Sequence, residues 1–190
     1  MKQSFCLRKI IYTSIISILG FSITFAQSGN EWSCFHGSDR TNRSAETGLL
    51  KTWPDGGPKL LWTISGIGEG YSSVIIANEH LYTEGRSGDM TAVFCFDLNG
   101  KPIWKKTCGK AWNTSLSWAS TYIGSRSTPT YSEGVLYVLS EAGHLEALNA
   151  LTGNEIWTRE LTTDFNASIP EYGYSESVLV DGNNLYVKPF

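Results

Sequence analysis

The chain has 190 residues and carries 15 Lys and Arg against 18 Asp and Glu, a formal net charge of −3. The two signs are interspersed, which excludes the dense basic surface expected of a protein that binds nucleic acid or an anionic membrane. Aromatic residues make up 13% of the chain, glycine is frequent, and long amphipathic helical patterns are absent. This composition favours an all-β domain.

Residues 1–26 have the organisation of a signal peptide. Lys2, Arg8 and Lys9 form a positive start, an uncharged apolar run follows, and Ala26 ends a cleavage site of small residues. An uncleaved N-terminal anchor is the alternative, although the run is short for a bilayer and diluted by serine and threonine. We therefore expect a periplasmic or secreted protein without a stable membrane span after cleavage.

Residues 27–58 form a polar lead-in without a clear period, and a repeating pattern of short strands occupies 59–190. Alternating β-branched and aromatic residues, closed by Gly, Asn and Asp turns, predict each strand. The segment 59–64 reads as an isolated final strand that ends near Trp62. The pattern then predicts one unit of strands at 72–76, 81–83, 91–96 and 102–107, a second at 127–131, 135–139, 144–148 and 155–160, and the start of a third at 175–180 and 185–187.

Units of four short strands that repeat about every 40–55 residues are typical of β-propeller blades. The chain holds two full units and ends at Phe190, within the third. A blade interrupted there would present an apolar face and unpaired edge strands, which a closed propeller removes. We therefore interpret the sequence as an N-terminal fragment of a longer protein.

The fourth strand of each unit carries the most specific motif. It reads Ala147-Leu-Asn-Ala-Leu-Thr-Gly-Asn-Glu-Ile-Trp157, and an earlier copy with a shorter turn ends in Trp104. Asn149 starts a turn and Gly153 supplies a positive φ, so that the tryptophan can pack flat on a neighbouring blade.

This motif resembles the tryptophan-docking repeat of the pyrroloquinoline quinone (PQQ) propeller superfamily, although Asn149 stands where Asp is usual. The lead-in around Trp32 and the segments near Trp62, Arg126 and Tyr172 are similar to members of this family as well. The resemblance implies a quinoprotein-like propeller of four-stranded antiparallel blades, incomplete here. It also implies about seven or eight blades in the parent protein, with the strand of Trp62 completing the last one.

The resemblance implies two classes of function. Some relatives are quinoprotein alcohol dehydrogenases that hold PQQ beside an adjacent-cysteine disulfide, with calcium and a catalytic carboxylate. Others, such as the outer-membrane assembly factor, are envelope scaffolds without a quinone. This chain has no adjacent cysteine pair, and none of its residues matches the calcium ligands or the catalytic acid.

We therefore expect a binding or scaffolding module of the cell envelope that carries no cofactor. Its candidate partners are an envelope protein, a small molecule or a glycan. The alternative is a PQQ-dependent alcohol or polyvinyl-alcohol dehydrogenase, with PQQ and calcium as cofactors. We assign no catalytic, cofactor-binding or metal-ligating residue on the sequence alone.

Several aromatic residues have both a structural and a functional interpretation. Trp104 and Trp157 could stack on a planar cofactor, but their repeat positions favour packing between blades. A second group lies between predicted blades and could line a channel mouth that suits a sugar, a quinone or a peptide. Its alternative role is to cover blade edges. The group consists of Trp112, Trp118, Tyr122, Arg126, Tyr172 and Tyr174.

Cysteines and histidines give no metal-binding pattern. The mature part keeps Cys34, Cys95 and Cys108, an odd number. Pairing across the intervening turn sets Cys95 opposite Trp104 or Lys105, so a disulfide to Cys108 needs a shift in register. Free buried thiols are the alternative. Neither the cysteines nor the histidines have zinc or haem spacing, and the default for His36, His80 and His144 is solvation or a local hydrogen bond.

Overall fold

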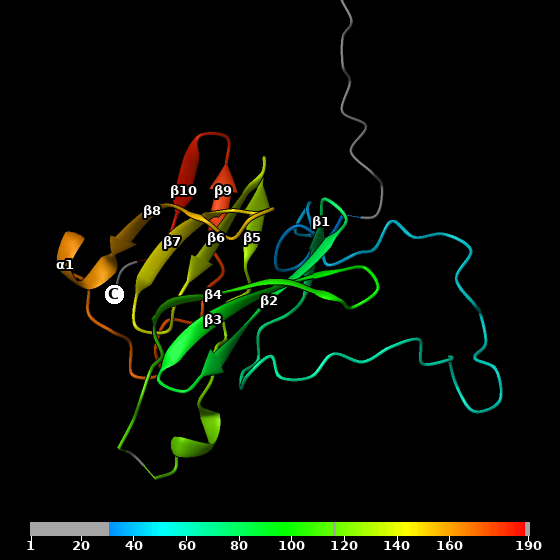
Figure 1. Cartoon of the computed structure of the whole chain (residues 1–190), viewed down its shortest axis with the longest axis horizontal. Helices are drawn as coiled ribbons and strands as arrows, with labels where there is room; N and C mark the ends of the chain where they lie inside the picture. The colour runs from blue at the N-terminus through cyan, green and yellow to red at the C-terminus, as the bar shows by residue number, and fades with distance from the viewer. Residues whose placement is uncertain (1–30, 116, 189–190) are drawn as a thin grey trace, which may run out of the picture.

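The computed structural model describes residues 31–115 and 117–188 (Figure 1). The predicted signal peptide lies outside the described residues. The described chain forms two four-stranded antiparallel sheets and one two-stranded hairpin. Its helices are limited to a 3₁₀ turn, η1 (Ser120–Tyr122), and a single α-helical turn, α1 (Leu161–Asp164). The predicted all-β class is therefore confirmed.

Both sheets are simple meanders in which each strand pairs with the next strand along the chain. The first sheet, here the first blade, consists of β1 (Ile75–Ala77), β2 (His80–Ser87), β3 (Met90–Asp97) and β4 (Pro102–Lys110). The second blade consists of β5 (Thr130–Ser132), β6 (Val135–Leu139), β7 (His144–Asn149) and β8 (Glu155–Glu160). A hairpin of β9 (Leu179–Asp181) and β10 (Asn184–Tyr186) follows. These are two propeller-type blades and part of a third.

The first hairpin of each blade, β1–β2 or β5–β6, is closed by a two-residue turn. Asn78 and Glu79 have φ values of 48° and 61°, and the corresponding residues Glu133 and Gly134 have 49° and 85°. Two successive left-handed residues define the turn type whose twist matches antiparallel strands. Equivalent turns in both blades support the prediction that one supersecondary unit is repeated.

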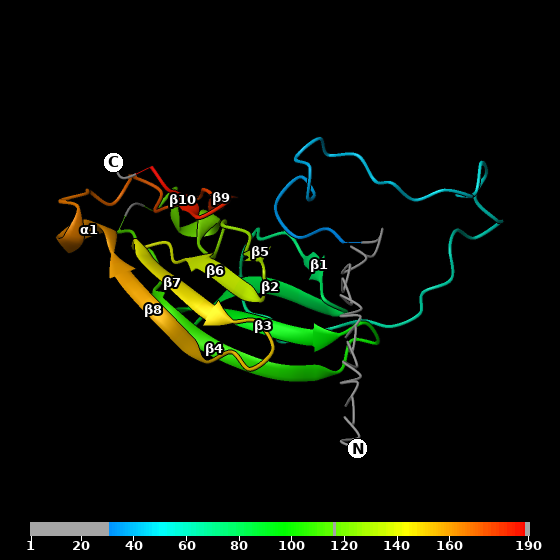
Figure 2. The same ribbon diagram turned by 90° about the horizontal axis from the view of Figure 1, so that it is seen from above.

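The two blades pack face to face and share one core. Figure 2 shows the second sheet lying across the first. Ile75, Tyr82 and Val93 of the first blade and Leu136 and Leu148 of the second are fully buried in the same cluster. Tyr82 also donates a hydrogen bond across the junction to the carbonyl oxygen of Ala150, at 3.2 Å. The alternating apolar residues that predicted the strands therefore build the junction between the blades.

The first strand of each unit begins later than the sequence predicts. β1 and β5 each start three residues later, and β9 starts four residues later. The residues before them hydrogen-bond through hydroxyl groups, to the next unit and, at Ser72 and Ser73, to Glu84 and Thr83 of β2, instead of through a regular backbone ladder. The Ser73 N–H donates to Thr128 Oγ1 at 3.1 Å, and the Thr128 N–H donates to Ser177 Oγ at 3.0 Å. A hydroxyl at the same position of each unit thus replaces a β-ladder.

The strand predicted at 59–64 is wrong, because this segment has no strand structure. Leu60 and Leu61 are 76% and 78% exposed. The end of the segment, at Ile64, packs on the first blade, against the cluster of Leu81, Phe94 and Phe96. It belongs to an irregular, strand-free segment, residues 43–68, here called the arm, much of which extends away from the sheets (Figure 1, blue to teal). The Trp62 ring nevertheless lies against Gly100, where an added Cβ would be 3.0 Å from it.

The predicted register of the cysteine-bearing hairpin is confirmed. Cys95 on β3 lies opposite Trp104 on β4, and Cys108 lies further along β4. Cys34, Cys95 and Cys108 are all free and buried. In the part of the chain that the structure describes, buried thiols rather than a disulfide are therefore present.

Candidate functional site

The docking tryptophans pack between blades. The Trp104 ring at the end of the first blade lies against Gly153 in the last turn of the second, and its Nε1 donates to the carbonyl oxygen of Ala150 at 3.1 Å. Trp157 takes part in the cluster that joins the second blade to the hairpin of β9 and β10. The structural interpretation of both tryptophans, packing between units, is confirmed by these contacts.

The turns that receive these tryptophans have the chemistry expected from the motif. Gly153 has a φ of 69°, and Asn149 Oδ1 accepts hydrogen bonds from the N–H groups of Leu151 and Thr152 at 3.1 and 3.0 Å. In the first blade, Asp97 Oδ1 accepts from the N–H groups of residues 99 and 101, both at 2.9 Å. Asparagine and aspartate therefore serve the same turn, as their shared acceptor oxygen allows.

The six inter-blade residues divide into two groups. Trp112 and Tyr174 are 7% and 0% exposed and belong to the core. Tyr174 packs on Gly143 and donates its hydroxyl to the carbonyl oxygen of Ser168 at 3.1 Å. The other four lie at the surface and converge on one open cavity of about 500 Å³, here called the Arg126 cavity. It is lined by Trp118, Tyr122, Arg126, Tyr172 and Ser175.

Arg126 fixes the aromatic residues around this cavity. Its guanidinium lies 5.5 Å from the ring centre of Trp112 and 5.9 Å from that of Tyr71, within cation–π range. Nη1 donates to the carbonyl oxygen of Tyr172 at 2.7 Å, and Nη2 donates to that of Tyr122. One side chain therefore ties together the segments that precede the second and third units.

Two buried glutamates lie in the same region, and sequence reasoning missed both. Glu141 accepts a hydrogen bond from the Trp112 N–H at 2.7 Å, and Glu84 accepts one from the Ser125 hydroxyl at 3.0 Å. Burial raises the pKa of both carboxyls; the charge of Glu141 adds to the effect on Glu84, and the Ser125 hydrogen bond opposes it. These groups anchor the loops behind the cavity, because their partners are loop atoms.

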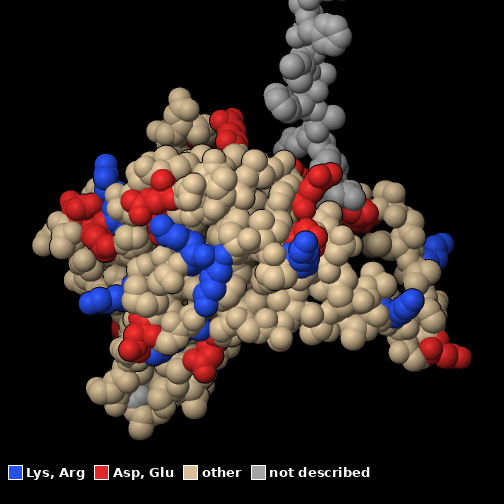
Figure 3. Space-filling view, viewed as in Figure 1, with Lys and Arg blue, Asp and Glu red and all other residues tan. Residues whose placement is uncertain are grey.

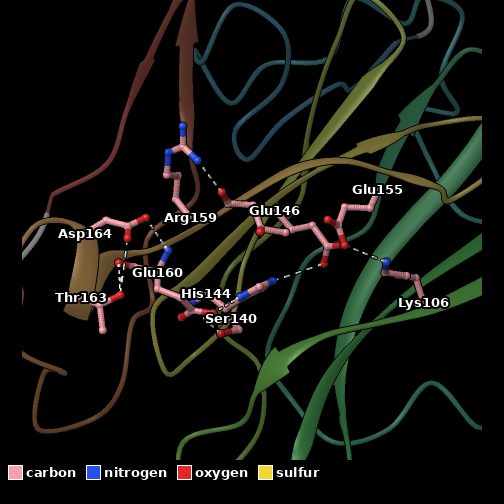
Figure 4. Close-up of polar contacts among 10 residues, drawn as sticks. Lys106, Ser140, His144, Glu146, Glu155, Arg159, Glu160, Thr163 and Asp164 are labelled. Carbon is pink, nitrogen blue, oxygen red and sulfur yellow. Dashed lines mark hydrogen bonds and ion pairs between the residues drawn. The ribbon is translucent and has the colours of Figure 1, made fainter.

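A second polar cluster joins the two blades at the surface (Figure 4). Lys106 on β4 places its Nζ 2.9 Å from Glu146 Oε1 on β7 and 3.6 Å from Glu155 Oε2 on β8. His144 lies between two carboxylates: its Nε2 is 3.7 Å from Glu146 Oε2, and its Nδ1 contacts Glu160. We call these five residues the inter-blade ion cluster.

The electrostatics of this cluster favour a structural role. The neighbouring Glu146 carboxylate is the main cause that raises the pKa of His144 to about 9, with Glu160 adding to it. Burial by itself raises the pKa of Glu146, but hydrogen bonds from His144, Cys108 and Lys106 outweigh it and leave that pKa lowered. Each buried charge is thus matched by an opposite one. Only Lys106 comes from the first blade, so its contacts with Glu146 and Glu155 could not be predicted from local spacing, whereas His144 and Glu160 are direct partners in the β7–β8 hairpin.

The remaining histidines have local contacts only. The His80 ring contacts the carbonyl oxygen of Asn78, and His36 stacks on Phe35 with ring centres 4.0 Å apart. Within 31–115 and 117–188, no group of three or more His, Cys, Asp or Glu residues could hold a metal ion. On the face shown in Figure 3, acidic and basic side chains are interspersed.

Residues 43–188 match the model of the PQQ-type family described as outer membrane protein assembly factor BamB. The chain belongs to this family. No curated protein matches the chain. Among the described residues, no helix is long and apolar enough to span a bilayer.

Solved structures with a similar fold include both functional classes of the family. BamB from Moraxella catarrhalis is 19% identical, with a TM-score of 0.39, over 53% of this chain and 26% of its own. Quinohemoprotein alcohol dehydrogenase ADHIIG from Pseudomonas putida HK5 is 19% identical, with a TM-score of 0.44, over 64% and 17%. The corresponding enzyme from Comamonas testosteroni is 17% identical, with a TM-score of 0.43, over 62% and 17%. The chain thus spans about a quarter or less of these proteins.

Within residues 31–115 and 117–188, no set of ligands converges as the calcium-assisted quinone site of the dehydrogenase branch would require. Such a site needs several oxygen ligands that converge on one cation. Of the buried carboxyls near the Arg126 cavity, Glu84 and Glu141 each accept one hydrogen bond through Oε2 and leave Oε1 without a partner, and no third acidic, histidine or cysteine side chain joins them in a cation site within the described residues. The sequence has no adjacent cysteine pair. We therefore derive no chemical step through PQQ or calcium.

Proposed function

We propose that this family member is an exported binding or scaffolding module of the cell envelope that works without PQQ. The observation that carries the proposal is the Arg126 cavity. It presents three exposed aromatic side chains, Trp118, Tyr122 and Tyr172, on a fixed frame. Aromatic side chains with an apolar body and a polar tip are the groups that protein surfaces use for recognition.

The chemistry of the cavity lining supports binding over catalysis. Its one charged group, Arg126, already donates to two backbone carbonyls. No Asp, Glu, His, Cys or Lys is among its lining residues. A general acid or base must lie within hydrogen-bond distance of the reacting atoms, and among the lining residues only Tyr122 and Tyr172, a less common choice than histidine, are of a type that enzymes use in this way. The signal-peptide pattern of residues 1–26 supports an envelope location.

The decisive experiment tests quinone chemistry on the full chain. PQQ and Ca²⁺ are added, binding is followed by calorimetry, and dye reduction is followed with ethanol and with a polyvinyl alcohol. We expect neither PQQ binding nor dye reduction above a heat-denatured control. Turnover that requires both PQQ and Ca²⁺ would establish the dehydrogenase instead.

The envelope location has its own test. The gene is expressed in a bacterial host, the periplasm is released by osmotic shock, and the mature N-terminus is read by mass spectrometry. We expect a periplasmic protein that starts at Gln27. A protein retained in the membrane with residues 1–26 intact would support the anchor instead.

A further inference from the structure

We propose that the Arg126 cavity binds a neutral saccharide of one or two pyranose units, with its ring face against Trp118 and Tyr172. The inference rests on the proposed binding function and names the ligand class. Trp118, Tyr122 and Tyr172 are 52%, 53% and 41% exposed, although each has a large apolar surface. Large aromatic side chains gathered at one open cavity mark a site of interaction.

The aromatic platform is rigid. Tyr172 lies between Trp112, at 6.3 Å and 36°, and Trp118, at 5.7 Å and 67° between ring planes. Its backbone carbonyl is held by Arg126. Trp112, behind it, is buried and fixed through its N–H by Glu141. A surface ordered before the ligand arrives loses little conformational entropy on binding.

The shape of the platform argues against a flat ligand. A planar quinone is held best in a slot with parallel walls, whereas the two neighbouring aromatic rings of the cavity lining, Trp118 and Tyr172, meet at 67°. A pyranose ring is puckered, with apolar C–H groups on its faces and hydroxyls at its edge. The tilted rings suit such faces, and three lining residues, Tyr122, Tyr172 and Ser175, carry hydroxyls of the kind that can pair with the sugar's edge.

The charge of the cavity argues for a neutral ligand. Arg126 is the only lining residue that carries a charge. Its guanidinium donates to two backbone carbonyls and lies over two aromatic rings, so much of its capacity for an anion is already used. The carboxyl of Glu141, buried behind the cavity, offsets that charge. Remaining guanidinium N–H groups suit the hydroxyl oxygens of a sugar.

The test uses the full chain and three neutral probes: cellopentaose, maltopentaose and chitopentaose. Binding is measured by calorimetry and by saturation-transfer NMR. We expect at least one probe to bind and Trp118→Ala to weaken it at least tenfold. Trp53→Ala is the matched control, because Trp53 is 67% exposed but lies in the arm, outside the cavity. We expect its affinity to equal that of the wild type.

A second variant guards against misfolding. Tyr122→Phe keeps the ring and removes only the hydroxyl, so we expect weaker binding with an unchanged circular dichroism spectrum. Absence of binding by all three probes, or binding that Trp118→Ala leaves unchanged, overturns the saccharide inference. If the saccharide probes fail and PQQ gives no turnover either, only the saccharide inference is overturned and the proposed binding function is unaffected. PQQ turnover that depends on Trp118 overturns both proposals.

Discussion

At the scale of single residues, Gly153 sets how the two blades pack. Its φ of 69° is accessible to glycine at little cost, and an added Cβ would lie 2.8 Å from ring atoms of Trp104. Two separate requirements therefore favour glycine at this position: the left-handed backbone of the turn and the space that the Trp104 ring occupies.

Replacing Gly153 by alanine separates these two requirements. Gly134 is the matched control, since its φ is 85° but nothing lies within 4 Å of an added Cβ. We expect Gly134→Ala to lower the free energy of unfolding by about 1–2 kcal/mol from backbone strain alone. Gly153→Ala should lose about 1–3 kcal/mol more, because the Trp104 ring must move. Urea denaturation measures both, and equal losses would contradict the docking.

His144 makes the stability of the blade junction depend on pH. Its pKa is raised from 6.5 to about 9 in the folded chain, mainly by the neighbouring Glu146 carboxylate. A raised pKa means that the folded state binds the proton more tightly, so the contribution is complete below pH 6.5 and is lost as the pH rises through 9.

We therefore expect the urea midpoint of the wild type to fall between pH 6.5 and 9.5. His144→Gln cannot titrate and should remove that part of the decline. NMR titration of the His144 ring gives its pKa directly. A value near 6.5, or an identical decline in the variant, would show that the inter-blade ion cluster does not act in this way.

At the scale of elements, the ion pair between β4 and β7 links strands of different blades. Lys106 is 30% exposed and Glu146 only 2%, so loss of the lysine leaves a carboxylate buried with fewer partners. The strand pattern predicts β4 and β7 well but contains no sign of this pair, because the two residues are 40 positions apart in the sequence.

A double-mutant cycle with Lys106→Met and Glu146→Gln measures the link. We expect each single variant to be less stable than the wild type, with a coupling free energy of about 1–2 kcal/mol. Chemical denaturation at pH 7 supplies the values. Additive effects would mean that the two side chains contribute independently, and Lys101→Met, in the exposed β3–β4 turn, controls for general charge effects.

The strand ends show a limit of local patterns. β6 and β8 match their predicted bounds, at 135–139 and 155–160, because each is flanked by strong turn residues. β1, β5 and β9 begin later than predicted, since Ser73, Thr128 and Ser177 form a chain of hydrogen bonds between units. From the sequence alone, serine and threonine at these positions fit a strand pattern, and only their hydrogen-bond partners show that the strand has not yet begun.

At the scale of the whole molecule, the arm and the blades differ in burial and in strand content. The blades share one buried core, whereas the arm exposes Leu60 and Leu61 and has no strand. Trp62 nevertheless lies on Gly100 as Trp104 lies on Gly153. The docking geometry therefore recurs even where the sheet does not, because a flat indole needs only a glycine turn to rest on.

The sequence by itself determined the all-β class, the four-strand repeat, the docking tryptophans and the family, because these depend on local alternation and turn chemistry. Only the tertiary structure decided which inter-blade residues are core and which line the Arg126 cavity. It also revealed the inter-blade ion cluster and the buried pair Glu84 and Glu141. The pairs Lys106–Glu146, Trp112–Glu141 and Glu84–Ser125 join residues that are distant in the sequence, and their burial and charge pairing become defined only once the blades are stacked.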